Sequence, residues 1–78
     1  MKKKRTHSQT RFVVCVRNDG YPEALELRKL YRVVADPQAL KIDHIRVIDE
    51  SGEDYLYPKK FFASVRLSEP VKRSLAAA

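Results

Sequence analysis

The stretch HIRVIDESGEDYLY, residues 44–57, decides the fold more clearly than any other part of the chain. Apolar and polar side chains alternate from His44 to Ile48, which is the period of a half-buried strand. The polar run 49–54 follows, and its Gly52 suits the positive φ that a tight loop requires. Two tyrosines then return at strand spacing. The stretch therefore predicts a β-hairpin in which aromatic residues face β-branched ones, namely Tyr55 and Tyr57 opposite Ile45 and Val47.

Three further apolar runs outside the hairpin predict three more strands. They lie at residues 12–16 (FVVCV), 30–34 (LYRVV) and 63–67 (ASVRL). Before the second of these runs, residues 23–29 predict an ordered, partly extended loop. Pro58 ends the hairpin because it cannot donate to a strand ladder, and a short 3₁₀ turn should follow it. The chain thus predicts five short strands.

Two polar residues predict helix starts. Asp36 stands before Pro37 and is suited to cap one helical turn at residues 37–40. Ser68 is suited to cap a helix at the C-terminus. In that helix Val71 and Leu75 are four residues apart, so we expect both to face the body of the protein.

A closed sheet is the expected arrangement of these strands. The 78 residues allow one domain with a marginal core, and a closed barrel removes the exposed strand edges that such a domain tolerates poorly. We therefore expect a mainly β protein, with a five-stranded barrel and C-terminal helix at residues 11–78. Residues 1–10 contain almost no apolar side chains and predict a flexible basic tail.

The order of these segments resembles the Src-homology-3-like (SH3-like) barrel. Residues 25–34 (LELRKLYRVV) are similar to the stretch after that family's long first loop. Residues 56–62 (LYPKKFF) are similar to the stretch that carries its proline, 3₁₀ turn and aromatic residue. The phrase RVIDESGEDYLYP at residues 46–58 also resembles short uncharacterised bacterial proteins.

SH3 domains bind proline-rich peptides in a groove lined by aromatic residues. The resemblance matches Pro58 to the groove proline and Phe61 to the groove aromatic. The family's paired tyrosines would fall at residues 14–18, where this chain has none. Its tryptophan would fall near Asp43 or His44, and the chain contains no tryptophan. The resemblance therefore implies the family's fold without its peptide groove.

Charge is concentrated at the N-terminus. The formal net charge is +6, and residues 1–11 contribute five positive charges with no acidic residue. A basic tail of this kind can contact phosphates. The six residues 49–54 hold four carboxylates but lack the ligand spacing of a calcium loop, so we interpret them as a charged hairpin turn.

The sequence offers no motif for catalysis or for a cofactor. Cys15 is the single cysteine, and His7 and His44 are the two histidines, so no spaced zinc set or intrachain disulfide is expected. We expect a buried, inert thiol at Cys15 and a surface or packing role for His44. The run at residues 12–16 is too short for a signal peptide or a membrane span. We expect no enzyme, no cofactor, no metal and no membrane partner, and the lone thiol suits the cytoplasm.

The leading hypothesis is a non-enzymatic binding module that recognises a protein or peptide. Its expected patch has an aromatic centre and a basic rim, and consists of Tyr21, Pro58, Lys59, Lys60 and Phe61. One alternative is a nucleic-acid-binding small barrel that uses Lys2, Lys3, Lys4, Arg5, Lys59, Lys60, Lys72 and Arg73. Another is a small dimeric structural protein, since self-association supports a marginal core. The partner and the oligomeric state do not follow from the sequence.

Overall fold

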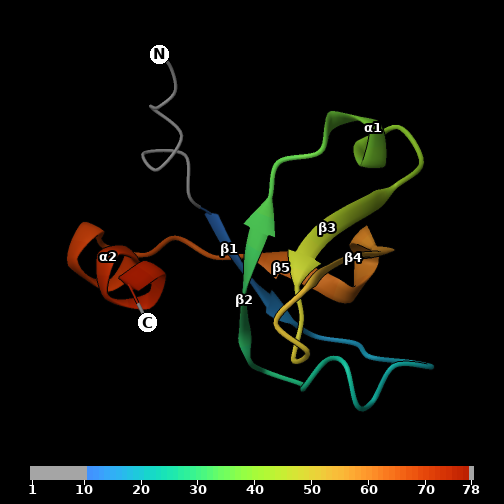
Figure 1. Cartoon of the computed structure of the whole chain (residues 1–78), viewed down its shortest axis with the longest axis horizontal. Helices are drawn as coiled ribbons and strands as arrows, with labels where there is room; N and C mark the ends of the chain where they lie inside the picture. Colours follow the sequence, from blue (N-terminus) through green and yellow to red (C-terminus); the bar gives the residue numbers. More distant parts are fainter. Residues whose placement is uncertain (1–10, 78) are drawn as a thin grey trace.

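The computed structural model describes residues 11–77, and the predicted tail, residues 1–10, lies outside them. Figure 1 shows strands that cross one another around a common interior, with the last helix set to one side. The elements in chain order are β1 (Arg11–Cys15), β2 (Leu30–Val34), α1 (Pro37–Leu40), β3 (His44–Ile48), β4 (Asp54–Pro58), the 3₁₀ helix η2 (Lys59–Phe61), β5 (Phe62–Ser64) and α2 (Glu69–Ala77). The mainly β class and the C-terminal helix are confirmed.

The five strands form one antiparallel sheet in the order β4-β3-β2-β1-β5. Among residues 11–77, β4 and β5 do not pair with each other, so they are the two edges of the sheet. The closure into a barrel that we expected is therefore not reached by strand pairing. β5 has only three residues, and β4 ends at Pro58, which has no N–H to donate to a further ladder.

The β3–β4 hairpin agrees with its prediction residue by residue. Two pairs lie directly opposite each other, Ile45 with Tyr57 and Val47 with Tyr55. Gly52 takes the expected positive φ, at 87°. The hairpin therefore follows from local sequence alone.

The other elements agree with their predictions less evenly. β2 has the predicted bounds, and β1 begins and ends one residue earlier than expected. The Asp36 side chain caps α1 by accepting from the Ala39 N–H at 3.3 Å, as predicted. β5 is displaced, because its pairing with β1 runs only from Phe62 to Ser64, after which the chain leads away to α2 (Figure 1).

The main core lies on one face of β1, and the half-buried Phe62 of β5 packs against it. Its buried members are Val13, Cys15, Leu25, Tyr31, Ile45, Val47, Tyr57 and Phe61. Leu25 belongs to the irregular loop between β1 and β2, and yet it is 0% exposed. Phe12 is also buried, but it points to the opposite face of β1 because side chains alternate along a strand.

Helix α2 packs less closely than expected. Val71 and Leu75 both remain exposed, so the prediction that they bury a shared face on the body is wrong. Leu75 only borders a shallow hollow beside Phe12 and Leu30. Among residues 11–77, no helix has the length and apolar character needed to cross a bilayer.

Candidate functional site

An open hollow of about 730 Å³ lies where the start of β3 meets the end of β4 and η2. Three segments line it: residues 42–44 at the start of β3, residues 58–60 where β4 passes into η2, and the first residue of β5. We call it the η2 hollow, and its residues are Ile42, Asp43, His44, Pro58, Lys59, Lys60 and Phe62. Three of its residues, Pro58, Lys59 and Lys60, belong to the predicted patch.

The backbone fixes the wall of the η2 hollow. His44 lies opposite Pro58 at the end of the β3–β4 ladder. Beyond Pro58 the next N–H, that of Lys59, donates to the Asp43 carbonyl at 2.9 Å. Asp43 itself has a positive φ of 57°, which turns the chain into β3. One ring nitrogen of His44, Nδ1, lies 2.8 Å from the Ile42 carbonyl. The loop before β3 is thereby joined to η2.

The hollow combines apolar surface with two cations. Ile42 is 60% exposed, and Pro58 and Phe62 are half-buried, so the lining offers carbon surface to a ligand. Lys59 and Lys60 are exposed at its rim. The geometry therefore suits an apolar group next to a negative one.

Only part of the predicted patch lies in this hollow. Pro58, Lys59 and Lys60 line it together, as the patch required. Tyr21 lies outside its lining and packs edge-on against Tyr57, with ring centroids 5.0 Å apart. Phe61 is 4% exposed and belongs to the core, so our expectation of an exposed aromatic there is wrong. Tyr21, forty residues earlier in the chain, helps to cover Phe61, because it packs edge-on against that ring with centroids 6.1 Å apart.

Four lining residues were not singled out as site residues by the sequence: Ile42, Asp43, His44 and Phe62. One signal pointed to two of them. The SH3 resemblance placed that family's groove tryptophan near Asp43 or His44, and those positions do line the hollow. Ile42 and Phe62 gave no such signal, because an apolar residue in a small domain is expected in the core.

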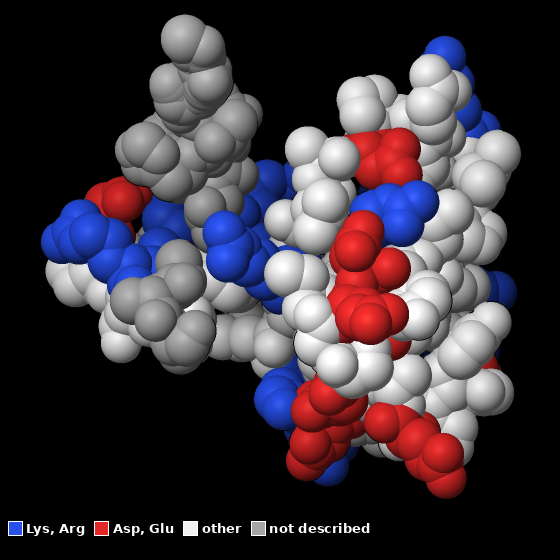
Figure 2. All heavy atoms as spheres, viewed as in Figure 1, with Lys and Arg blue, Asp and Glu red and all other residues white. Residues whose placement is uncertain are grey.

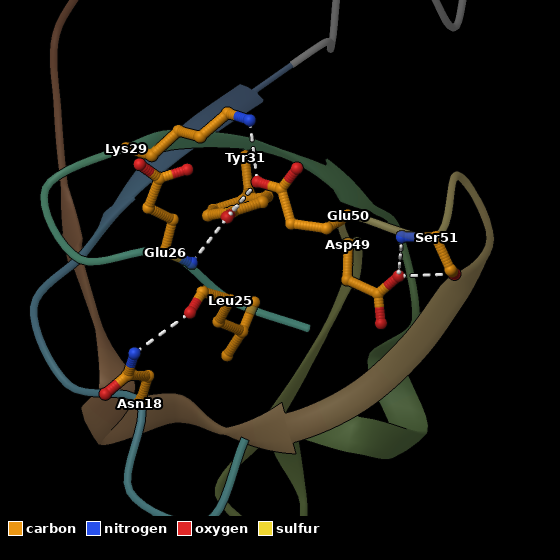
Figure 3. Close-up of polar contacts among 8 residues, drawn as sticks. All are labelled: Asn18, Leu25, Glu26, Lys29, Tyr31, Asp49, Glu50 and Ser51. Atoms are coloured by element: carbon orange, nitrogen blue, oxygen red, sulfur yellow. Dashed lines mark hydrogen bonds and ion pairs between the residues drawn. The ribbon is translucent and has the colours of Figure 1, made fainter. Parts of the chain in front are cut away.

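A second set of polar contacts anchors the loop between β1 and β2 on the hairpin turn (Figure 3). The Tyr31 hydroxyl donates to Glu50 Oε2 at 2.5 Å and accepts from the Glu26 N–H at 2.7 Å. Lys29 Nζ donates to the same carboxylate oxygen at 2.6 Å. Hydrogen bonds from Lys29 and Tyr31 hold the pKa of Glu50 below its usual value. The set stabilises the loop.

The neighbouring carboxylate, Asp49, is buried. It accepts from the Ser51 N–H at 2.9 Å, the Ser51 hydroxyl at 2.6 Å and the Tyr57 hydroxyl at 2.5 Å. Burial acts to raise the pKa of Asp49, but these hydrogen bonds outweigh it and the pKa is lowered. The carboxylate is thus fully engaged in shaping the turn.

The remaining candidate groups are buried or lie elsewhere. The Cys15 thiol is buried and donates to the Arg17 carbonyl at 3.1 Å, and burial raises its pKa. Within residues 11–77, no group of three His, Cys, Asp or Glu side chains could hold a metal ion.

The cations of the nucleic-acid alternative do not form one surface. Lys72 and Arg73 lie on α2, which Figure 1 places on the opposite side of the sheet from η2 with its Lys59 and Lys60. The tail cations Lys2, Lys3, Lys4 and Arg5 lie outside the described residues.

Comparison with known proteins adds no further assignment. No family model, no curated protein and no solved structure matches the chain. The site is therefore interpreted from its own geometry.

Proposed function

We propose that the protein is a non-enzymatic binding module that accepts a protein or peptide segment in the η2 hollow. The observation that carries the proposal is the lining itself, in which the exposed Ile42 and the half-buried Phe62 stand beside Lys59 and Lys60. An apolar recess with a few charged groups at its rim is typical of ligand sites on small domains.

We further propose that the fold is of the SH3-like type. Three features support it: the strand order, the fourteen-residue connection at residues 16–29 between β1 and β2, and the 3₁₀ helix between β4 and β5. The η2 hollow differs from the proline-binding groove of that family, because it holds no tyrosine or tryptophan. A different peptide chemistry is therefore expected.

An acidic, partly apolar segment is the ligand that the lining favours. Lys59 and Lys60 supply two positive charges, and Asp43 is the single carboxylate among the lining residues. His44 adds a ring nitrogen, Nε2, that can donate or accept. A ligand with one apolar side chain next to a carboxylate would place each group against its complement.

Selection from a library of displayed random peptides would test the proposal. We expect enriched peptides that combine acidic and large apolar residues. Titration of one such peptide into isotope-labelled protein should shift the amide signals of His44, Lys59 and Lys60. The double variant Lys59→Glu/Lys60→Glu should weaken binding at least about tenfold, or about 1.4 kcal/mol.

The matched control is Arg66→Glu/Arg73→Glu, which changes the net charge by the same amount at exposed positions away from the hollow. It should leave peptide affinity almost unchanged. Equal losses in both double variants, or shifts confined to residues outside the hollow, would contradict the proposal.

A further inference from the structure

Charge is divided along the chain in three blocks. Residues 1–18 hold six Lys and Arg and no acid, and residues 55–78 hold five cations and one acid. Residues 19–54 between them hold nine acids and five cations. The two terminal blocks are thus both basic, and the middle of the chain is acidic.

The fold brings the two basic blocks together. β1 and β5 are antiparallel neighbours in the sheet, so the residues that begin β1 lie beside the chain that leaves β5. A small hollow of about 140 Å³ lies there, lined by cations from three segments, Arg11, Arg66 and Lys72. Phe12 forms part of its wall. Residues distant in sequence therefore converge here.

Two more arginines extend this surface. Arg32 lies directly opposite Phe12 across the β1–β2 pair, so its side chain starts from the same face of the sheet. Arg73 is exposed and follows Lys72 on α2. We call the whole set the basic surface: Arg11, Arg32, Arg66, Lys72 and Arg73. Figure 2 shows blue atoms gathered on the side of α2, whereas red atoms gather at the hairpin turn and the loop between β1 and β2.

Most of this positive charge is not neutralised within the part of the chain that the structure describes. Lys72 forms an ion pair with Glu69 at 3.1 Å. For the four arginines of the basic surface, no carboxylate of residues 11–77 lies within ion-pair distance. Cations held together without acidic partners repel one another, and an incoming polyanion relieves that repulsion.

We propose that the basic surface binds the phosphate backbone of a nucleic acid. Four of its five members are arginines, whose planar guanidinium matches phosphate in a bidentate way. The sequence before Arg11 adds four cations, Lys2 to Arg5, to the same end of the chain. The acidic hairpin end repels phosphate and would direct the strand toward α2. This proposal is independent of the η2 hollow.

Fluorescence anisotropy with short labelled DNA and RNA, single-stranded and duplex, would test it on the full chain. We expect binding at about 50 mM salt that falls steeply toward about 200 mM. The variant Arg66→Glu/Arg73→Glu should lose at least about tenfold in affinity. Its slope of log affinity against log salt should be shallower by roughly 0.7 to 0.9 for each contact removed.

The variant Lys59→Glu/Lys60→Glu is the control, because it has the same net charge and alters the opposite side of the sheet. It should keep nearly the affinity of the wild type. Circular dichroism checks that both variants fold. If Arg66→Glu/Arg73→Glu does not fold, Arg66→Gln/Arg73→Gln replaces it. No binding at low salt, equal losses in both variants, or equal affinity for polyglutamate or anionic lipid vesicles would each overturn the proposal.

Discussion

The loop between β1 and β2 (residues 16–29) and the helix α2 both lie outside the sheet, and they are built in opposite ways. The loop is irregular, yet Leu25 is wholly buried and polar contacts join it to the hairpin turn. The helix is regular, yet Val71 and Leu75 stay exposed. Local regularity and burial are therefore separate properties in this protein. The loop belongs to the core, whereas α2 is an addition to its outside.

The strongest test of this comparison is Leu25→Ala. We expect a loss of about 2–5 kcal/mol in the free energy of unfolding, because a fully buried leucine leaves a cavity. Urea denaturation of the purified protein measures it. Leu27→Ala, in the same loop but exposed, is the control and should cost under about 0.5 kcal/mol. Similar small losses for both would show that the loop is not part of the core.

Tyr31→Phe tests the polar anchoring of the loop. The change leaves the Glu26 N–H without its acceptor and removes one donor from Glu50. We expect a loss of about 1–3 kcal/mol and faster hydrogen exchange at the Glu26 amide. Tyr55→Phe is the matched control, since its hydroxyl bonds Glu53 at an exposed position. An unchanged exchange rate at Glu26 would contradict the anchoring.

Acid should destabilise the hairpin turn and the loop that it holds. The pKa values of Asp49 and Glu50 are lowered in the folded protein, so the unfolded chain binds protons more readily. The stability that these carboxylates contribute is present above their unfolded pKa and is lost as the pH falls below about 5. Urea midpoints measured across that range should fall with pH.

Glu50→Gln provides the control for this pH dependence. It removes one of the two groups, so the decline in stability with falling pH should be shallower than in the wild type. An identical pH profile in the variant would show that Glu50 does not contribute.

The smallest effect is expected at Leu75→Ala. The side chain is 38% exposed and only borders a shallow hollow, so the loss should be under about 0.5 kcal/mol. Comparison with Leu25→Ala uses the same chemical change in both segments. A loss near that of Leu25→Ala would mean that α2 is a core element, and the comparison would fail.

The sequence alone predicted only part of the candidate site. Pro58, Lys59 and Lys60 were predicted together because they are consecutive, and the η2 hollow does unite them. Phe61 was expected at the surface beside them. Its burial depends on Tyr21, forty residues earlier, which packs against its ring. No local pattern reports a contact over that distance.

The sequence by itself determined the features that depend on neighbouring residues. Alternation and Gly52 determined the hairpin, Asp36 and Pro37 determined the start of α1, and apolar runs determined where β1 and β2 lie. These features rest on backbone conformation and short-range hydrogen bonds, which a short stretch of chain encodes on its own.

Only the tertiary structure decided which side chains meet from distant parts of the chain. It placed Leu25 in the core, left Val71 and Leu75 exposed, and left β4 and β5 unpaired at the edges of the sheet. It also brought Arg11, Arg66 and Lys72 to one hollow. Which side chains are buried and which charges lie together depend on how the whole chain packs around a small interior. The order of the residues alone does not state that packing.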